Sequence, residues 1–321
     1  MPVSPMKCPG PEPLAEEPLS DRRTSATPAL SPASQLALPS APPRSLRRWA
    51  TAFALLLVCG LVYLAGDQRR PVPAAVGASL SGKGTRSTTS IATLRVASFN
   101  IHGGTGRDRR YDLARTAAAL NGFDLALLNE VHGPYFWQTE GQVETLAGLT
   151  DQRWLFAPTE QRWWHHQFGN AVLSAADVTQ WQRIVLPGSG RGYRNAVLLS
   201  IPFAGRTLHL LGTHFDRNSA ADRAQQFQAV TRLFLALAEP AILLGDLNMT
   251  ADEGSIRELL ARGGVHDPLG EVLGDAAGRH IDWILTRGLT TIDAGTIDNG
   301  ASDHPLIWAE LGVKYKSFTV W

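Results

Sequence analysis

The stretch AILLGDLN, residues 241–248, is an apolar run that stops abruptly at a carboxylate and an amide. The run predicts a buried strand, and Asp246 and Asn248 follow where that strand leaves its sheet. In an open α/β sheet, ligands bind beyond the carboxyl ends of the strands. Asp and Asn also follow strands simply as turn formers or helix caps. The stretch therefore indicates a site only if other strands end in the same way.

Other predicted strands do end in polar residues. A strand over residues 94–99 leads to Asn100 and His102, one over 124–128 leads to Glu130, and one over 207–213 leads to His214. Further strands are predicted at 170–174, 196–201, 281–285 and 306–311, and helices at 108–120, 143–149 and 220–238. The order strand, helix, strand occurs twice. It predicts two similar halves, each a sheet with helices on its outer side, whose strand ends converge.

The side chains expected at these strand ends are rich in oxygen and free of sulfur. Mg²⁺ and Mn²⁺ prefer such ligands and use only one or two protein carboxylates. A catalytic zinc site of the HExxH type is excluded, because the sequence lacks that motif. Histidines beside carboxylates suit acid–base work on a water that attacks a phosphate. The set is Asn100, Glu130, His214, Asp246, Asn248, Asp282, Asp303 and His304.

Seven short motifs stand in the order typical of one superfamily. They are FNIH at 99–102, LNE at 128–130, GNAVLS at 169–174, GTHFD at 212–216, GDLN at 245–248, HIDWIL at 280–285 and SDH at 302–304. Over residues 93–313 the chain resembles the endonuclease/exonuclease/phosphatase superfamily of DNase I-like, metal-dependent phosphoesterases, as a membrane-anchored bacterial-type member. Where the family usually has Gln before its glutamate, this chain has Asn129.

The resemblance implies an α/β (α+β) fold, a four-layer sandwich of two mixed β-sheets packed face to face with helices outside. It also implies a hydrolase of phosphoric esters, with Mg²⁺ or Mn²⁺ as cofactor. The expected reaction is cleavage of a phosphodiester by His/Asp-assisted in-line attack of water, of the endonuclease/phosphodiesterase type. The alternatives are a phospholipid or sphingomyelin-type phosphodiesterase, a small-molecule phosphatase, and a catalytically inactive binding module on the same fold.

The resemblance also implies roles for individual residues. Glu130 looks like the main metal ligand, helped by Asn100 and Asp303. His304, oriented by Asp282, looks like the group that activates water or stabilises the phosphorane, and Asp246 looks like the group that positions the water. Asn248 looks like a donor to a phosphate oxygen, and His214 looks like the group that aids the leaving group. The expected substrate contacts are Asn170, Arg223 and His102.

Charge is unevenly distributed along the chain. Residues 91–313 contain 18 arginines, no lysine and 24 acidic residues, a net charge of −6, although the whole chain is +1. A net acidic region is not the footprint of a protein that grips a long polyphosphate backbone. The only cysteines, Cys8 and Cys59, lie outside this region, so it contains neither a disulfide framework nor a cysteine metal site.

Residues 49–66, WATAFALLLVCGLVYLAG, are uncharged and apolar. As a helix, 18 residues span roughly 27 Å, about one bilayer core. We expect an uncleaved single transmembrane anchor, against the alternatives of a cleaved signal peptide and a buried core helix. Three arginines precede the run and two follow it, which favours a cytoplasmic N-terminus and a catalytic domain outside the cytoplasm, in the periplasm.

The expected domain organisation has five parts. These are a disordered segment (1–43), the anchor with its flanks (44–70), a flexible linker (71–93), the catalytic domain (94–313) and a tail (314–321). The expected partners are a phosphoester substrate (nucleic acid, phospholipid or small phosphoester) and the membrane that holds residues 49–66. The protein is expected to be monomeric.

Overall fold

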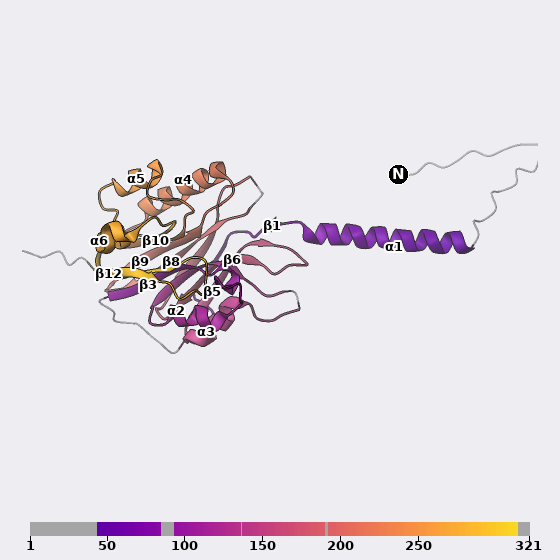
Figure 1. The fold of residues 1–321 in the computed structure, drawn as a ribbon, viewed down its shortest axis with the longest axis horizontal. Coiled ribbons are helices and arrows are strands. Elements are labelled where there is room, and N and C mark those ends of the chain that lie inside the picture. Colours follow the sequence, from indigo (N-terminus) through magenta and orange to yellow (C-terminus); the bar gives the residue numbers. More distant parts are fainter. Residues whose placement is uncertain (1–43, 85–92, 136, 190–191, 314–321) are drawn as a thin grey trace, which may run out of the picture. The chain divides into compact units, whose positions relative to one another are not determined.

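Two mixed β-sheets form the centre of the fold in the computed structural model, which describes residues 44–84, 93–135, 137–189 and 192–313 (Figure 1). The seven-stranded sheet has the order β1-β5-β6-β4-β3-β13-β12 and the six-stranded sheet the order β11-β10-β9-β8-β7-β2. The strands of the first sheet are β1 (Arg70–Pro71), β3 (Thr93–Asn100), β4 (Leu125–His132), β5 (Arg153–Gln161), β6 (Phe168–Ser174), β12 (Leu289–Ile297) and β13 (Leu306–Val313). Those of the second are β2 (Ala75–Gly77), β7 (Gln180–Val185), β8 (Asn195–Phe203), β9 (Arg206–His214), β10 (Ala241–Asp246) and β11 (Asp282–Arg287).

Three apolar clusters explain the layers. The largest lies between the sheets, where side chains such as Val96, Leu127 and Leu244 meet. Successive strand residues point to opposite faces, so neighbours such as Phe99 and Leu243 pack on the outer faces instead. There they meet α2 (Leu113–Leu120) and α3 (Gln142–Thr150) on one side, and α4 (Ala220–Ala236) and α5 (Gly254–Leu260) on the other (Figure 1). The expected four-layer sandwich with helices outside is confirmed.

The repeated order of strand, helix and strand forms two parallel units. In the first, β3 and β4 pair in parallel across α2, and in the second, β9 and β10 pair in parallel across α4. The strands predicted at 196–201 and 207–213 are β8 and β9, which pair as an antiparallel hairpin that turns at Ala204 and Gly205. The two-halved organisation expected from the sequence is therefore present, with each unit in its own sheet.

Some element bounds differ from those predicted. The helix expected at 108–120 begins at Leu113, because the Asp112 side chain caps it by accepting a hydrogen bond from the Arg115 amide at 3.0 Å. The helix expected to end at 238 ends at Ala236, close before Pro240, which restricts the residue before it to extended backbone. Strands β5, β7 and β12 and helices α5 and α6 (Pro268–Leu273) were not predicted.

The prediction that residues 71–93 form a flexible linker is wrong for the part of this segment that the structure describes. Arg70 and Pro71 pair with β5, and Ala75, Val76 and Gly77 pair with β7, so the segment adds an edge strand to each sheet. Leu80 is also buried in the cluster between the sheets. Composition missed this because the two strands are only two and three residues long. Residues 85–92, like the predicted disordered segment 1–43 and tail 314–321, lie outside the described residues.

Helix α1 (Arg44–Asp67) contains the apolar run. It is long and apolar enough to cross a membrane, judged by length and composition only. Large apolar side chains along it, such as Trp49 and Leu56, are exposed. The boundary between two separately clustered parts of the chain falls within α1, between Ala54 and Leu55.

Candidate active site

Three neighbouring strands of the six-stranded sheet, β9, β10 and β11, place three of the predicted site residues next to one another. Asp246, the last residue of β10, pairs in register with His214 at the end of β9 and with Asp282 at the start of β11. The three ionisable side chains therefore lie side by side at the same end of these strands. Each is at most 3% exposed. The loop before β13 adds His304, whose Nε2 lies 4.0 Å from Asp246 Oδ2.

His304 is held by Asp282. Its Nδ1 lies 2.7 Å from Asp282 Oδ2, which fixes the ring and leaves Nε2 facing Asp246. Burial works against the charged imidazole, but the hydrogen bond and charge of Asp282, with Asp246 and Asp303, outweigh burial and raise the pKa of His304 to about 9. In the metal-free site His304 is therefore a cation at neutral pH.

His214 has the opposite character. Its burial, and then the nearby charges of Arg194 and His304, hold its pKa well below the ordinary value for histidine. The guanidinium Nη1 of Arg194 lies 3.3 Å from His214 Nδ1, and a guanidinium can only donate. Nδ1 is then the acceptor and Nε2 carries the proton, 3.5 Å from Asp246 Oδ2. His214 is a neutral imidazole that presents an N–H to the site.

Asp246 is the centre of the arrangement. Its Oδ2 accepts a hydrogen bond from Asn100 Nδ2 at 3.1 Å, and its Oδ1 accepts one from the Asn248 amide at 2.9 Å. Burial, and then the charge of Asp282, raise the pKa of Asp246 to about 7 despite these donors and His304. A carboxyl with that pKa exchanges protons readily near neutral pH, as a general base must.

Glu130 reaches the site through a backbone irregularity. The register of β4 against β6 shifts between Leu128 and Val131, and Glu130 has a positive φ of 58°. A non-glycine residue seldom adopts this conformation, and bulges of this kind re-aim side chains next to active sites. Asn100 Nδ2 donates to Glu130 Oε1 at 3.2 Å and thus joins Glu130 to Asp246.

Two sets of donors fit a divalent metal. Glu130 offers a half-buried carboxylate beside the Asn100 amide, the oxygen-rich environment that Mg²⁺ and Mn²⁺ prefer. Asp246, Asp282 and His304 form a second set, with one ligand atom from each within 4.8 Å of the others. Asp282 Oδ1 is buried without a hydrogen-bond partner among the described residues, which suits a cation. The His304–Asp282 hydrogen bond already occupies the other Asp282 oxygen.

The other predicted residues lie at different depths. Asp303 is half exposed, and its Oδ1 is 3.7 Å from Nδ1 of the exposed His102. Arg223 donates to the backbone oxygens of Asp216 and Arg217, which braces the turn after β9. Asn170 is 1% exposed, and its amide joins the side chains of Asn129 and Asn195. The metal role of Asp303 and the substrate contacts of the other three stay predictions.

Asn129 connects the two units, a role that its place before Glu130 did not reveal. Its Oδ1 accepts from the Asp246 amide at 3.0 Å, and its Nδ2 donates to the Thr213 oxygen at 3.2 Å and to Asn170 Oδ1 at 2.8 Å. Asn129, which stands where the family that the chain resembles usually has Gln, thus ties β4 to β9 and β10. A buried amide that ends one strand was the only sequence signal for it.

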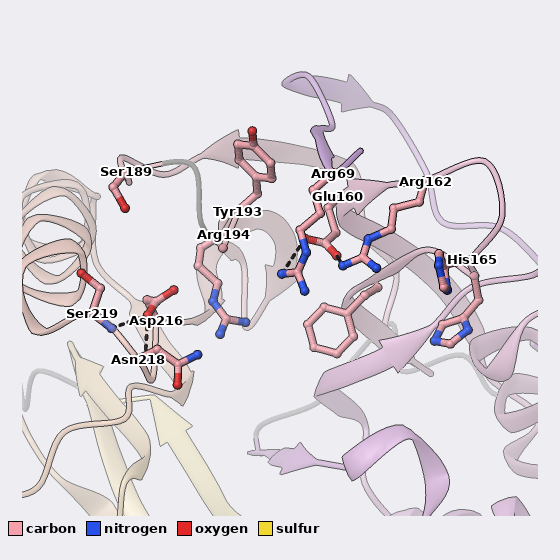
Figure 2. Close-up of a pocket in the computed structure, with 13 residues that line it drawn as sticks. Arg69, Glu160, Arg162, His165, Ser189, Tyr193, Arg194, Asp216, Asn218 and Ser219 are labelled. Carbon is pink, nitrogen blue, oxygen red and sulfur yellow. Dashed lines mark hydrogen bonds and ion pairs between the residues drawn. The ribbon is translucent and has the colours of Figure 1, made fainter. Parts of the chain in front are cut away.

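A pocket of about 690 Å³ lies next to Arg194 and Asp216 (Figure 2). Its lining includes Arg69, Glu160 and Arg162, none of which the sequence analysis selected. Arg194 is the link between pocket and site, since its guanidinium also touches His214. Burial lowers the pKa of Arg194, although the charges of Asp216 and Glu130 oppose that effect.

Comparisons with known proteins agree with the fold and the motifs. The sequence model of the Endonuclease/Exonuclease/phosphatase family matches residues 97–304. An endonuclease/exonuclease/phosphatase from Beutenbergia cavernae DSM 12333 is 21% identical, with a TM-score of 0.57 over 70% of this chain and 72% of that one. Humanized D. rerio TDP2 is 20% identical, with a TM-score of 0.54 over 70% of this chain and 100% of that one. The corresponding protein from Bacteroides vulgatus is 15% identical, with a TM-score of 0.56 over the same 70% and 100%. No curated protein matches the chain.

Proposed function

Because the chain belongs to the endonuclease/exonuclease/phosphatase family, we propose that it is a divalent-metal-dependent phosphodiesterase of the endonuclease/phosphodiesterase type. Members of this family are generally phosphoesterase hydrolases that use a divalent metal. The observation that carries the proposal is the buried carboxyl of Asp246, set between the His304–Asp282 pair and the Asn100–Glu130 pair. That arrangement offers a base, a cation and a metal ligand around one point.

We assign the Mg²⁺ or Mn²⁺ to Glu130 and Asn100, with Asp303 as a further contributor. The hydrogen bond that holds Asp282 on His304 supports this choice, because a histidine tied in this way suits proton transfer or charge stabilisation. When bound, the cation polarises the phosphoryl group and offsets charge that develops on its oxygens. A site at Asp246, Asp282 and His304 is the competing assignment.

Asp246 is the base that we assign to the attacking water. Its pKa of about 7 lets it accept a proton near neutral pH, whereas His304, with a pKa of about 9, already holds one. The resemblance left His304 two roles, water activation and phosphorane stabilisation. Its charge favours the second, since a fixed imidazolium beside the phosphoryl oxygens stabilises the negative charge of an in-line displacement.

His214 and Asn248 complete the proposed chemistry. The Nε2–H of His214 is a neutral donor next to Asp246, which suits a hydrogen bond to the leaving oxygen. Asn248, held with φ at 50°, uses its side-chain N–H on the Phe215 oxygen at 3.0 Å and has a second N–H for a phosphate oxygen. His214 is the last residue of β9, and Asn248 lies two residues beyond the end of β10.

We further propose that α1 anchors the protein in a membrane, with the catalytic domain outside the cytoplasm. The exposed apolar side chains of α1 and the arginines before it support this. The pairing of β1 and β2 with the two sheets supports a catalytic domain that begins before residue 94, near Arg69. An enzyme anchored in a membrane is held close to phospholipid head groups. A phospholipid phosphodiesterase is therefore the second candidate function.

The test is hydrolysis by the full chain, purified in a mild detergent. With Mg²⁺ or Mn²⁺ it should cleave bis-p-nitrophenyl phosphate, and cleavage should stop when the metal is chelated. A panel of plasmid DNA and phosphatidylcholine vesicles then ranks the nuclease against the phospholipid phosphodiesterase. Metal binding by calorimetry without hydrolysis of any panel member would instead identify a binding module. Truncation at residue 91 is unsuitable because it removes β1, β2 and Leu80.

A further inference from the structure

The pocket beside the catalytic residues has an unusual concentration of arginines. Figure 2 shows Arg69, Glu160 and Arg162 on one side, Asp216, Asn218 and Ser219 on the other, and Arg194 between them. Arg69 and Arg162 each lie 3.5 Å from Glu160, so one carboxylate serves two guanidinium groups. The described lining of the pocket thus contains three arginines and two carboxylates, Glu160 and Asp216.

The opposite wall supplies one carboxylate, Asp216, whose charge acts on Arg194. Asp216 Oδ1 accepts hydrogen bonds from the amides of Asn218 and Ser219, both at 2.7 Å, in the turn that leads into α4. Meanwhile the Nε atoms of Arg162 and Arg194 are buried and have no hydrogen-bond partner among the described residues. A buried donor without an acceptor costs free energy, and an anionic ligand that supplied an acceptor to it would remove that cost.

Arg69 lines the pocket because the strand that follows it, β1, pairs with β5. Arg70 and Pro71 are in register with Gln161 and Glu160 of β5, and the Val72 amide donates to the Thr159 oxygen at 3.2 Å. Arg70 also lies over the Trp163 ring, 5.2 Å from its centroid. These contacts place the residue just before β1 beside Glu160 and Arg162. A segment expected to be a linker thus supplies part of a binding wall.

The pocket meets the catalytic residues at Arg194, whose Nη1 lies 3.3 Å from His214 Nδ1. Arg194 thus joins the pocket to the catalytic residues, and we place the remainder of the substrate in the pocket when its phosphoester lies at Asp246 and His304. Phe168 and Tyr193 in its lining offer ring surface to the part of the substrate between the two ends. Arginine is the side chain best suited to a phosphate at the far end, because its planar fork binds two phosphate oxygens.

We propose that Arg69, Arg162 and Arg194 form a second anion subsite, which selects phosphodiesters that carry an additional phosphate group. The inference rests on the proposed function, since it places the scissile phosphoester at Asp246 and His304. It goes further by naming the substrate class, a phosphodiester with a second phosphate, and by assigning specificity to Arg69 and Arg162. The carrier of that second phosphate is either a soluble compound or a lipid head group.

The experiment compares matched substrates with the full chain in detergent and Mg²⁺. The soluble pair is thymidine p-nitrophenyl phosphate with and without a second phosphate on the other sugar hydroxyl. The lipid pair is phosphatidylglycerol phosphate and phosphatidylglycerol in phosphatidylcholine vesicles. We expect the second phosphate to raise kcat/KM by about tenfold or more in at least one pair, as charge-assisted hydrogen bonds imply. A preference in one pair alone identifies the soluble or the lipid source.

Variants locate the preference in the pocket. Arg69→Gln and Arg162→Gln should each reduce the preference about fivefold, and the double variant should abolish it, because each removes one charged fork. Arg257→Gln, on the exposed face of α5, is the matched control and should keep it. Circular dichroism melts check that the variants fold. Cleavage of both members of each pair at equal kcat/KM overturns the subsite but leaves the proposed function intact.

A binding measurement keeps the inference testable without activity. If bis-p-nitrophenyl phosphate is not cleaved, the proposed function fails, and calorimetric titration with inorganic phosphate in the presence of a chelator tests the subsite alone. We expect the double variant to bind phosphate about tenfold more weakly than the wild-type chain. Equal binding by the two proteins overturns the inference.

Discussion

The two parallel units, β3–α2–β4 and β9–α4–β10, have the same order of elements but end differently. The first ends at Asn100 and, after a bulge, at the half-buried Glu130. The second ends at His214 and Asp246, which are 3% and 1% exposed. The difference fits the two roles that we propose, a metal site in the first unit and acid–base groups in the second. A metal ligand must leave coordination positions open, whereas acid–base groups need burial to shift their pKa values.

The sharpest way to break this comparison is to neutralise one carboxylate in each unit. Asp246→Asn should lower kcat at least about a hundredfold at any metal concentration, because it removes the general base. Glu130→Gln should lower activity at low Mg²⁺ and recover much of it when the metal concentration is raised, because it weakens a ligand. Kinetics over a metal titration separate the two. Asp275→Asn, an exposed change of the same kind, should match the wild-type chain.

The opposite pattern of metal dependence in the two variants would support the competing metal site. If Asp246→Asn recovers with added metal and Glu130→Gln does not, the cation is held by Asp246, Asp282 and His304, whose ligand atoms lie within 4.8 Å of one another. The two units would then exchange their proposed roles. The assignment of Mg²⁺ or Mn²⁺ to Glu130 and Asn100 would have to be abandoned.

The second prediction concerns Gly245, which lets β10 bring Asp246 to the site. Gly245 has φ of 137°, and a Cβ there would overlap the Thr213 backbone oxygen. Gly245→Ala should therefore lower the free energy of unfolding by roughly 3 kcal/mol, through backbone strain and displacement of β9. Gly148→Ala in α3 is the control, since a Cβ there meets nothing within 4 Å, and it should be neutral or stabilising. Urea denaturation measures both, and a Gly245→Ala protein as stable as wild type would contradict the argument.

The third prediction concerns Asn129, which joins the units. Asn129→Ala removes the acceptor of the buried Asp246 amide and the donor to the Thr213 oxygen. We expect the free energy of unfolding to fall by about 2 kcal/mol and kcat to fall about tenfold, because Asp246 loses its backbone support. Asn121→Ala, at the exposed end of α2, should change neither. Unchanged kcat in Asn129→Ala would show that the two units hold their side chains independently.

The strand ends were predictable from the sequence because each unit places polar residues directly after a buried strand. Asp246 follows five buried residues of β10, and Asn100 ends a strand that is buried over most of its length. This signal is local to each strand. The order of the seven motifs along the chain adds the information that these distant strand ends belong to one site. The sheet arrangement also followed, since two strand–helix–strand patterns imply parallel pairs.

The arginine pocket was not predictable, and the reason is physical. Arg69 enters it only because a two-residue strand pairs with β5, some 90 residues later, and such short pairing leaves no periodic pattern. β7 is half exposed along its length and mixes polar with apolar residues, so its strand signal is weak. Asn129 likewise gives no sign that its amide reaches Asp246 in the other sheet.

The last and smallest prediction uses the raised pKa values in the second unit. His304, with a pKa raised from 6.5 to about 9, adds stability that is complete below pH 6.5 and lost as pH rises through about 9. Asp246, raised from 3.8 to about 7, costs stability as it ionises over that interval. At these two groups the folded protein binds more protons than the unfolded chain, whereas the lowered pKa of His214 has the opposite effect below about pH 6.5. The metal-free protein should therefore become less stable between about pH 6 and about pH 9.

Urea midpoints of the chelator-treated protein measure this slope. Asp282→Asn removes the negative charge that raises the pKa of His304 and leaves only a neutral acceptor, so its stability should change less at the alkaline end. Asp275→Asn should keep the wild-type slope, because that carboxylate lies on the surface. If the midpoint rises with pH in the wild-type chain, His304 is not a cation in the metal-free site. The division between a metal-binding unit and an acid–base unit would then lose its electrostatic basis.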